Sequence, residues 1–217
     1  MIPCLLVAGA LLTPIATTAA AKPPKPPGQQ GVTLKPSATL VTFSHTLVTT
    51  VSVKGAKAGV GVTLQRRPTT SQTWSAAEMK TTDRHGDASF TTRPRVNTAY
   101  RAVAHTTPEQ TSAEAVVRVA PLVGFRVSDS TPSAGQRVRF AGTVRPRHTG
   151  RRVAIQRRTS TGSWVTVKRT RLKAATTRYS KYATRVRVRR TGTYRVRLAA
   201  HADHAAGVSR ERTLTVG

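Results

Sequence analysis

The residues with the clearest capacity for chemistry are the arginines of the stretch RVRVRRTGTYRVRL, residues 185–198, where arginine alternates with valine or leucine. In a β-hairpin, Arg185, Arg187, Arg195 and Arg197 would face water, while the apolar residues between them would face a core. A guanidinium group pairs well with a phosphate or a carboxylate. The stretch is therefore either one surface for a polyanion or only the solvated side of a hairpin.

A second pair of arginines, Arg137 and Arg139, alternates in the same way within QRVRFAG. The sequence does not fix the side of the fold on which their strand lies. Binding through such side chains neutralises charge and releases counterions, so we expect it to be steeply salt-dependent and weakly selective. The candidate polyanion-binding residues are Arg137, Arg139, Arg185, Arg187, Arg195 and Arg197.

Acid–base catalysis by paired carboxylates has little support, because the chain holds only four Asp and four Glu. The nearest pair, Asp83 and Asp87, flanks RHG and is typical of a turn in which Asp83 caps and Gly86 takes a positive φ. The sequence contains no G-x-S-x-G motif, no catalytic cysteine and no phosphate-binding glycine loop. We expect no catalytic residue and no cofactor.

The sequence HADH, residues 201–204, could present His201, Asp203 and His204 to a metal ion. The same four residues occupy the turn between the last two predicted strands, where an earlier part of the chain has HTTPEQ. Three candidate ligands within four residues of a turn are a weak signal. We therefore assign no metal site.

The net charge of the chain is +28, from 36 basic and eight acidic residues. Such a charge attracts nucleic acid, anionic lipid or acidic wall polymers. Arginine outnumbers lysine 27 to 9, which suits bidentate contacts. The compositional bias of a GC-rich genome would produce the same excess without selection for binding, and this alternative stays open.

The first thirty residues predict export. An apolar run from Ile2 to about Leu12 is followed by small residues and by Ala19-Ala20-Ala21, an A-x-A cleavage pattern, so residues 1–21 are expected to be a signal peptide. A retained membrane anchor is the competing interpretation. The only cysteine, Cys4, lies in this segment, so the mature chain would have no disulfide. Residues 22–30, KPPKPPGQQ, predict an extended proline-rich linker.

Beyond the linker the chain repeats itself. VTLQRRPTTSQTW (62–74) returns as VAIQRRTSTGSW (153–164), and TAYRAVA (98–104) returns as GTYRVRLA (192–199). The spacing of about ninety residues indicates an internal duplication, with domain 1 at 31–120 and domain 2 at 121–217. Domain 2 has 23 basic and three acidic residues, against 11 and five in domain 1. The excess charge is therefore a property of domain 2.

Each copy has about seven strand-like runs separated by turn signals, which predicts an all-β chain of two tandem immunoglobulin-like β-sandwiches. The pattern V-x-[LI]-Q-R-R, a turn and Trp, then TDRHGDASF in domain 1 and TTRYSKYA in domain 2, and a later T-x-Y-R or A-Y-R, resembles the Ig-like repeats of secreted and surface proteins of actinobacteria. The resemblance covers both copies and says little about a ligand. It implies Ig-like sandwiches without the disulfide of antibody domains.

Four aromatic residues recur at matching positions in the two copies, namely Trp74, Trp164, Tyr100 and Tyr194. They could form a sugar-stacking platform. Since each occurs in both copies, we expect them to pack in the core or at a tyrosine corner.

The sequence therefore predicts a secreted, non-enzymatic module whose basic second domain binds an anionic wall polymer or another polyanion, and binding to a wall polymer would hold the protein at the cell wall. A purely structural spacer is the first alternative, and a binder of extracellular nucleic acid is the second. A protein partner also stays open, and no stable membrane span is expected after signal cleavage.

Overall fold

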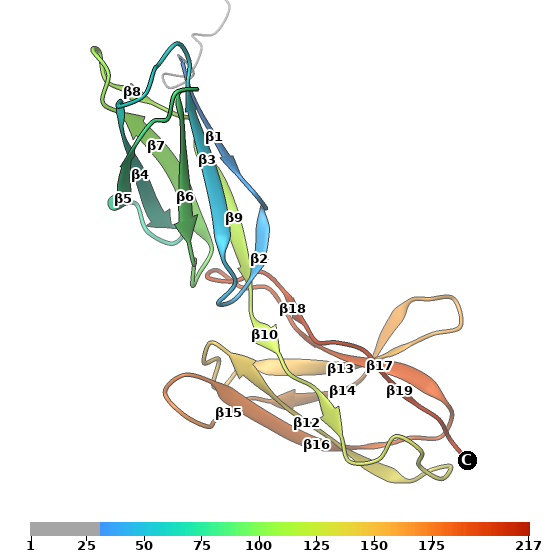
Figure 1. Ribbon diagram of the computed structural model, residues 1–217. Coiled ribbons are helices and arrows are strands. Elements are labelled where there is room, and N and C mark those ends of the chain that lie inside the picture. The colour runs from blue at the N-terminus through green and yellow to red at the C-terminus, as the bar shows by residue number, and fades with distance from the viewer. Residues whose placement is uncertain (1–30) are drawn as a thin grey trace, which may run out of the picture.

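The computed structural model describes residues 31–217, and every layer of it is built from short β-strands (Figure 1). These residues contain strands, bends and turns but no helix. No segment of 31–217 is a helix of the length and apolarity needed to cross a membrane. The predicted signal peptide and proline-rich linker lie outside the described residues.

The first sandwich has two sheets with the strand arrangement of an Ig-like domain. One sheet is ordered β1 (Val32–Pro36), β3 (Leu47–Val53), β6 (Asp87–Thr92). The other is ordered β2 (Leu40–Thr42), β9 (Ala115–Ala120), β7 (Thr98–Ala104), β4 (Gly61–Pro68), β5 (Ser75–Thr81), with β8 (Gln110–Thr111) beside β7. Neighbours are antiparallel except for β2 and β9, which are parallel.

The second sandwich repeats this plan. Its first sheet, called the β12–β16 sheet, is ordered β10 (Leu122–Val123), β12 (Arg137–Arg145), β16 (Ser180–Arg187), β15 (Lys173–Ala174), with β11 (Arg126–Val127) beside β12. Its second sheet, called the β13–β17 sheet, is ordered β14 (Trp164–Arg171), β13 (Arg152–Arg158), β17 (Gly192–Leu198), β18 (Gly207–Val208), with β19 (Arg212–Leu214) beside β17. The all-β, two-sandwich prediction is confirmed.

Each sandwich has its own core, made by the inward residues of its two sheets. In the first, Leu47, Phe90 and Tyr100 have no exposed surface. In the second, the ring centres of Phe140 and Tyr194 lie 5.3 Å apart in an edge-to-face contact, and Val186 and Val196 belong to the same core. The alternation of buried valine with exposed arginine therefore orients β16, as the sequence predicts.

The predicted hairpin at 185–198 is wrong. β16 belongs to the β12–β16 sheet and β17 to the β13–β17 sheet, so the segment 188–191 carries the chain from one sheet to the other. The physical reason is that a two-residue period fixes which side of a strand is buried but not which strand lies beside it.

The two sandwiches meet where a turn of the second contacts a turn and the end of β9 of the first. The backbone N–H of Asn97 donates to the carbonyl oxygen of Asp203 at 2.8 Å, and the Ala205 N–H donates to the carbonyl of Val119 at 2.9 Å. Figure 1 shows the turn before β18 reaching the end of the first sandwich. The Asn97 side-chain amide adds a bond to the Ala202 carbonyl at 3.3 Å. The turn at 201–205 is thus part of the contact between the sandwiches.

Candidate polyanion-binding surface

Four of the six candidate arginines face one another in two directly opposed pairs. The antiparallel register of β12 and β16 places Arg137 opposite Arg187 and Arg139 opposite Arg185. All four side chains are exposed, and residues directly opposite in a sheet have Cβ atoms about 5 Å apart. These four residues are called the arginine quartet.

The quartet lies within a larger basic face. Lys181 pairs with Thr143, and Lys173 pairs with Lys181, so both lysines share the outer face of the sheet. Arg126 lies opposite Ala141 on the same face, and Arg145 ends β12. The five strands of this sheet contain no Asp or Glu. Every charged side chain that these strands place on the outer face of the β12–β16 sheet is therefore positive.

The ion pairs found among residues 31–217 lie entirely in domain 1. They join Arg67 to Glu114 at 3.0 Å and Lys80 to Glu78 at 3.4 Å, and His105 Nδ1 hydrogen-bonds with Glu109 Oε2 at 3.1 Å in the same domain. Within the described chain, then, no basic side chain of domain 2 has a carboxylate partner within 4.0 Å. Like charges directly opposite in a sheet are destabilising, and an external anion would relieve that repulsion.

The other two candidates, Arg195 and Arg197, do not join the quartet. Both lie on β17 in the β13–β17 sheet, so the expectation that Arg185, Arg187, Arg195 and Arg197 form one patch is wrong. Arg195 is half-buried, and its Nε donates to Gln156 Oε1 at 2.9 Å. Its guanidinium carbon lies 4.0 Å from the centre of the Trp164 ring. Partial burial lowers the pKa of Arg195, although the group stays charged.

Domain 1 repeats this arrangement residue for residue. Arg101 Nε donates to Gln65 Oε1 at 2.7 Å, and its guanidinium carbon lies 4.4 Å from the centre of the Trp74 ring. The arginine at this position belongs to the shared architecture and not to the excess charge of domain 2. Arg195 therefore has a structural reason to be arginine, unlike the members of the quartet.

The expectation for the four repeated aromatic residues is half right. Tyr100 and Tyr194 are buried, at 0% and 3% exposure, and the Tyr100 hydroxyl hydrogen-bonds with Thr92 Oγ1 at 3.3 Å. Trp74 and Trp164 are only half-buried and lie against arginine side chains. The tryptophans lie outside both cores because they sit at the edge strand or the turn beside it, β5 and β14, where an arginine covers them.

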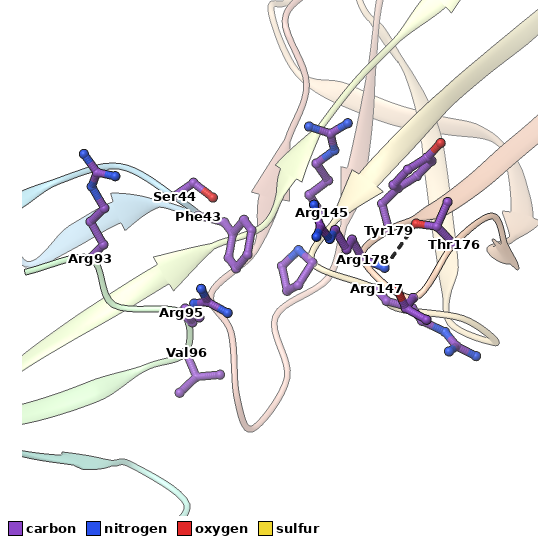
Figure 2. Close-up of a pocket in the computed structure, with 12 residues that line it drawn as sticks. Phe43, Ser44, Arg93, Arg95, Val96, Arg145, Arg147, Thr176, Arg178 and Tyr179 are labelled. Carbon is purple, nitrogen blue, oxygen red and sulfur yellow. Dashed lines mark hydrogen bonds between the residues drawn. The ribbon is translucent and has the colours of Figure 1, made fainter. Parts of the chain in front are cut away.

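A cleft between the sandwiches was missed at the sequence level. It has a volume of about 1180 Å³. Figure 2 shows Phe43, Arg93 and Arg95 on one side and Arg145, Arg147 and Arg178 on the other. No carboxylate lines it, and the Arg145 guanidinium carbon lies 5.1 Å from the centre of the Tyr179 ring.

Arg145 connects this cleft with the basic face, because it is the last residue of β12. The other arginines of the cleft come from loops that lie up to about 85 residues apart in the sequence, so no local pattern marks them; they are Arg93, Arg95, Arg147 and Arg178. Arg145 thus belongs both to the β12–β16 sheet and to the lining of the cleft.

The turn at Asp83 is as predicted. Asp83 Oδ1 accepts hydrogen bonds from the backbone N–H groups of His85 at 2.8 Å and Asp87 at 3.0 Å, and Gly86 has a φ of 79°. The N–H groups of Asp87 and His85 hold the pKa of Asp83 below its usual value. This carboxylate therefore serves the turn.

The possible metal ligands at the HADH turn differ from the three that the sequence suggests. His201 and His204 are joined by His148, from the loop after β12, and one ring nitrogen of each lies within 4.8 Å of one from each of the others. Asp203, the third residue suggested by sequence, is exposed and is not part of this group. Burial lowers the pKa of all three imidazoles, that of His204 to about 4.

No family model matches the chain, and no curated protein matches it in sequence. Among the solved structures that are similar to it in shape are the following two. The D0-D1 domain of Intimin has 16% sequence identity and a TM-score of 0.32, with 85% of this chain and 99% of that chain covered. Salmonella alpha-2-macroglobulin reacted with methylamine has 12% identity and a TM-score of 0.38, with 85% of this chain and 16% of that chain covered.

Proposed function

We propose that this protein is a non-enzymatic extracellular module that associates with an anionic polymer of the cell wall or its surroundings through the outer face of the β12–β16 sheet. The observation that carries this proposal is the arginine quartet, two directly opposed arginine pairs with no carboxylate on any strand of their sheet. The predicted signal peptide supports the extracellular part.

The spacing of the cations favours a polymer over a small anion. Opposed arginines stand about 5 Å apart across the strands, and successive outward residues stand about 7 Å apart along each strand. A flexible chain with repeated phosphate or carboxylate groups can contact several of these cations at once. A single small anion would engage only one opposed pair.

Comparison of the two sandwiches gives a second line of support. On aligning the Gln-Arg-Arg motifs, Arg137 and Arg139 correspond to Thr46 and Val48 of domain 1. Because the same fold accepts neutral residues there, folding does not demand the arginines. Their cost in mutual repulsion is offset when a polyanion binds.

The test is retention of the purified protein on isolated cell-wall material across a salt gradient. The test variant changes all four members of the quartet to threonine, which is a good strand former. A matched control changes four exposed arginines outside that sheet to threonine, namely Arg152, Arg158, Arg210 and Arg212. Each variant loses the same charge.

We expect the quartet variant to elute at much lower salt and the control to elute near the parent protein. The slope of log affinity against log salt should fall by about 3 for the quartet variant, since each lost contact contributes somewhat less than 1. Equal losses in both variants would mean that net charge alone acts, and retention of the quartet variant at the parent's salt would favour the spacer. If DNA displaces the protein better than wall polymer does at matched charge, the partner is nucleic acid.

A further inference from the structure

Three of the six histidines of the chain gather where the two sandwiches meet. His148 follows β12, and His201 and His204 frame the turn between β17 and β18. The ring centres are 4.9 to 5.1 Å apart, and no two rings are parallel. The three rings are therefore tilted against one another and not stacked, and one nitrogen of each lies within 4.8 Å of one from each of the others.

Hydrogen bonds fix which nitrogens carry protons. His148 Nδ1 lies 2.7 Å from the carbonyl oxygen of Pro146, and His204 Nε2 lies 3.0 Å from that of Arg95. A carbonyl oxygen only accepts, so both of these nitrogens must be donors. In the neutral rings, His148 Nε2 and His204 Nδ1 are then left with free lone pairs.

Several of these ring nitrogens are buried without a hydrogen-bond partner among the described residues. They are His204 Nδ1 and both nitrogens of His201. His204 is 5% exposed and His148 is 7% exposed. Buried polar atoms are normally paired, so nitrogens left this way in one cluster point to a ligand that accepts lone pairs.

We propose that His148, His201 and His204 form a binding site for a Zn²⁺ ion. Three imidazole nitrogens with a water or an anion in the fourth position are a common zinc ligand set, and imidazole favours zinc over magnesium or calcium. The remaining N–H groups of His148 and His204 donate to backbone carbonyls, which is the usual way in which ligating histidines are oriented.

Binding requires only a small closure of the cluster. Tetrahedral Zn–N bonds of about 2.0 to 2.1 Å place the nitrogens about 3.3 Å apart, whereas here they lie within 4.8 Å of one another. The His201–His204 turn is held by reciprocal backbone bonds of 2.9 and 3.2 Å. The adjustment therefore falls on side-chain torsions.

The charges around the cluster act in both directions. Asp203 is close enough to raise the pKa of all three histidines, and Arg151 is close enough to lower that of His148 and His201. Asp203 favours a cation and Arg151 opposes one. The neutral imidazole is the form that binds a metal.

The position of the site gives the ion a structural role. His148 anchors the loop that carries Arg147 of the cleft, and the 201–205 turn carries the hydrogen bonds to Arg95, Asn97 and Val119. One ion would tie both segments together and brace the contact between the sandwiches.

The test is a calorimetric titration of the purified, metal-free protein with zinc chloride at pH 7.5. We expect one site per chain, and Co²⁺ in its place should give the strong visible absorption of a tetrahedral centre. His201→Gln is the cleanest single variant, because the His201 side chain makes no hydrogen bond to lose. It should weaken zinc binding at least tenfold.

The other three histidines provide a matched control. His45, His85 and His105 are all exposed. Changing the three together to Gln removes three imidazoles, the same number as the cluster contains. The control triple variant should bind zinc like the parent protein. Absence of one-to-one binding in the parent, or unchanged binding in His201→Gln, would overturn the proposal. Retention of the His201→Gln variant on cell-wall material is measured as well. Because this variant keeps the arginine quartet, its wall retention tests the proposed function separately from zinc binding.

Discussion

The guanidinium group of Arg195 covers the ring of Trp164, with its carbon 4.0 Å from the ring centre, and the pair is tied to the sheet by a hydrogen bond from Arg195 to Gln156. The same three residue types meet in the first sandwich at Arg101, Trp74 and Gln65. The duplication has therefore preserved an arginine–tryptophan stack on the outside of a sheet, next to but separate from the core.

This relationship predicts that Arg195→Ala destabilises domain 2. The change removes a cation–π contact and one side-chain hydrogen bond, so the free energy of unfolding should fall by about 1 to 2 kcal/mol. Urea unfolding followed by tryptophan fluorescence measures it. Arg197→Ala is the control, because Arg197 lies on the same strand and has no such contact among the described residues; it should change the free energy by less than about 0.5 kcal/mol. Equal effects of the two changes would refute the structural role.

The alternating pattern of the sequence predicted the two sandwiches and the side of each strand that is buried. Val186 and Tyr194 lie in the core for this reason. It could not predict that β16 and β17 belong to different sheets, because pairing depends on the whole topology. Nor could it bring His148 to His201, about fifty residues away, since a loop of one sheet and a turn of the other meet only in the folded chain.

The quartet should cost stability in the free protein. Arg139 and Arg185 are directly opposed, so Arg139→Thr should raise the free energy of unfolding by about 0.2 to 1 kcal/mol at low salt. The gain should shrink in high salt, where exposed charges are screened. Urea midpoints at low and high sodium chloride measure both effects. Arg212→Thr is the control, because Arg212 lies opposite Tyr194. A gain that is the same at both salt concentrations would contradict repulsion as its cause.

The same urea measurement, made on the quartet variant, provides a control for the wall-retention test. A quartet variant that is at least as stable as the parent cannot lose retention by unfolding, so lower retention would then report the surface itself. The double variant Arg139→Thr with Arg185→Thr should gain less than the sum of the two single changes, because either change alone already removes the pair.

The Asp83 turn gives a pH dependence with a definite sign. Backbone N–H groups of Asp87 and His85 donate to Asp83 Oδ1, and they hold the pKa of this carboxyl below that of an unfolded chain. A lowered pKa in the folded state means that the carboxylate stabilises the fold above the unfolded value, about 3.9, and that this contribution is lost as the pH falls through the folded value. Asp83→Ala should therefore be less stable than the parent at neutral pH.

The difference in free energy of unfolding between the parent and Asp83→Ala should narrow as the pH falls below about 4. The reason is that a protonated carboxyl accepts the two N–H hydrogen bonds more weakly than a carboxylate does. Urea unfolding of both proteins from pH 7 down to about pH 2.5 measures this difference, and subtracting one curve from the other removes the titration of the remaining carboxylates. Asp129→Ala is the comparison in domain 2, where Asp129 Oδ1 accepts one backbone N–H, from Thr131. A difference for Asp83→Ala that stays constant across the range would show that the turn depends on the shape of the side chain and not on its charge.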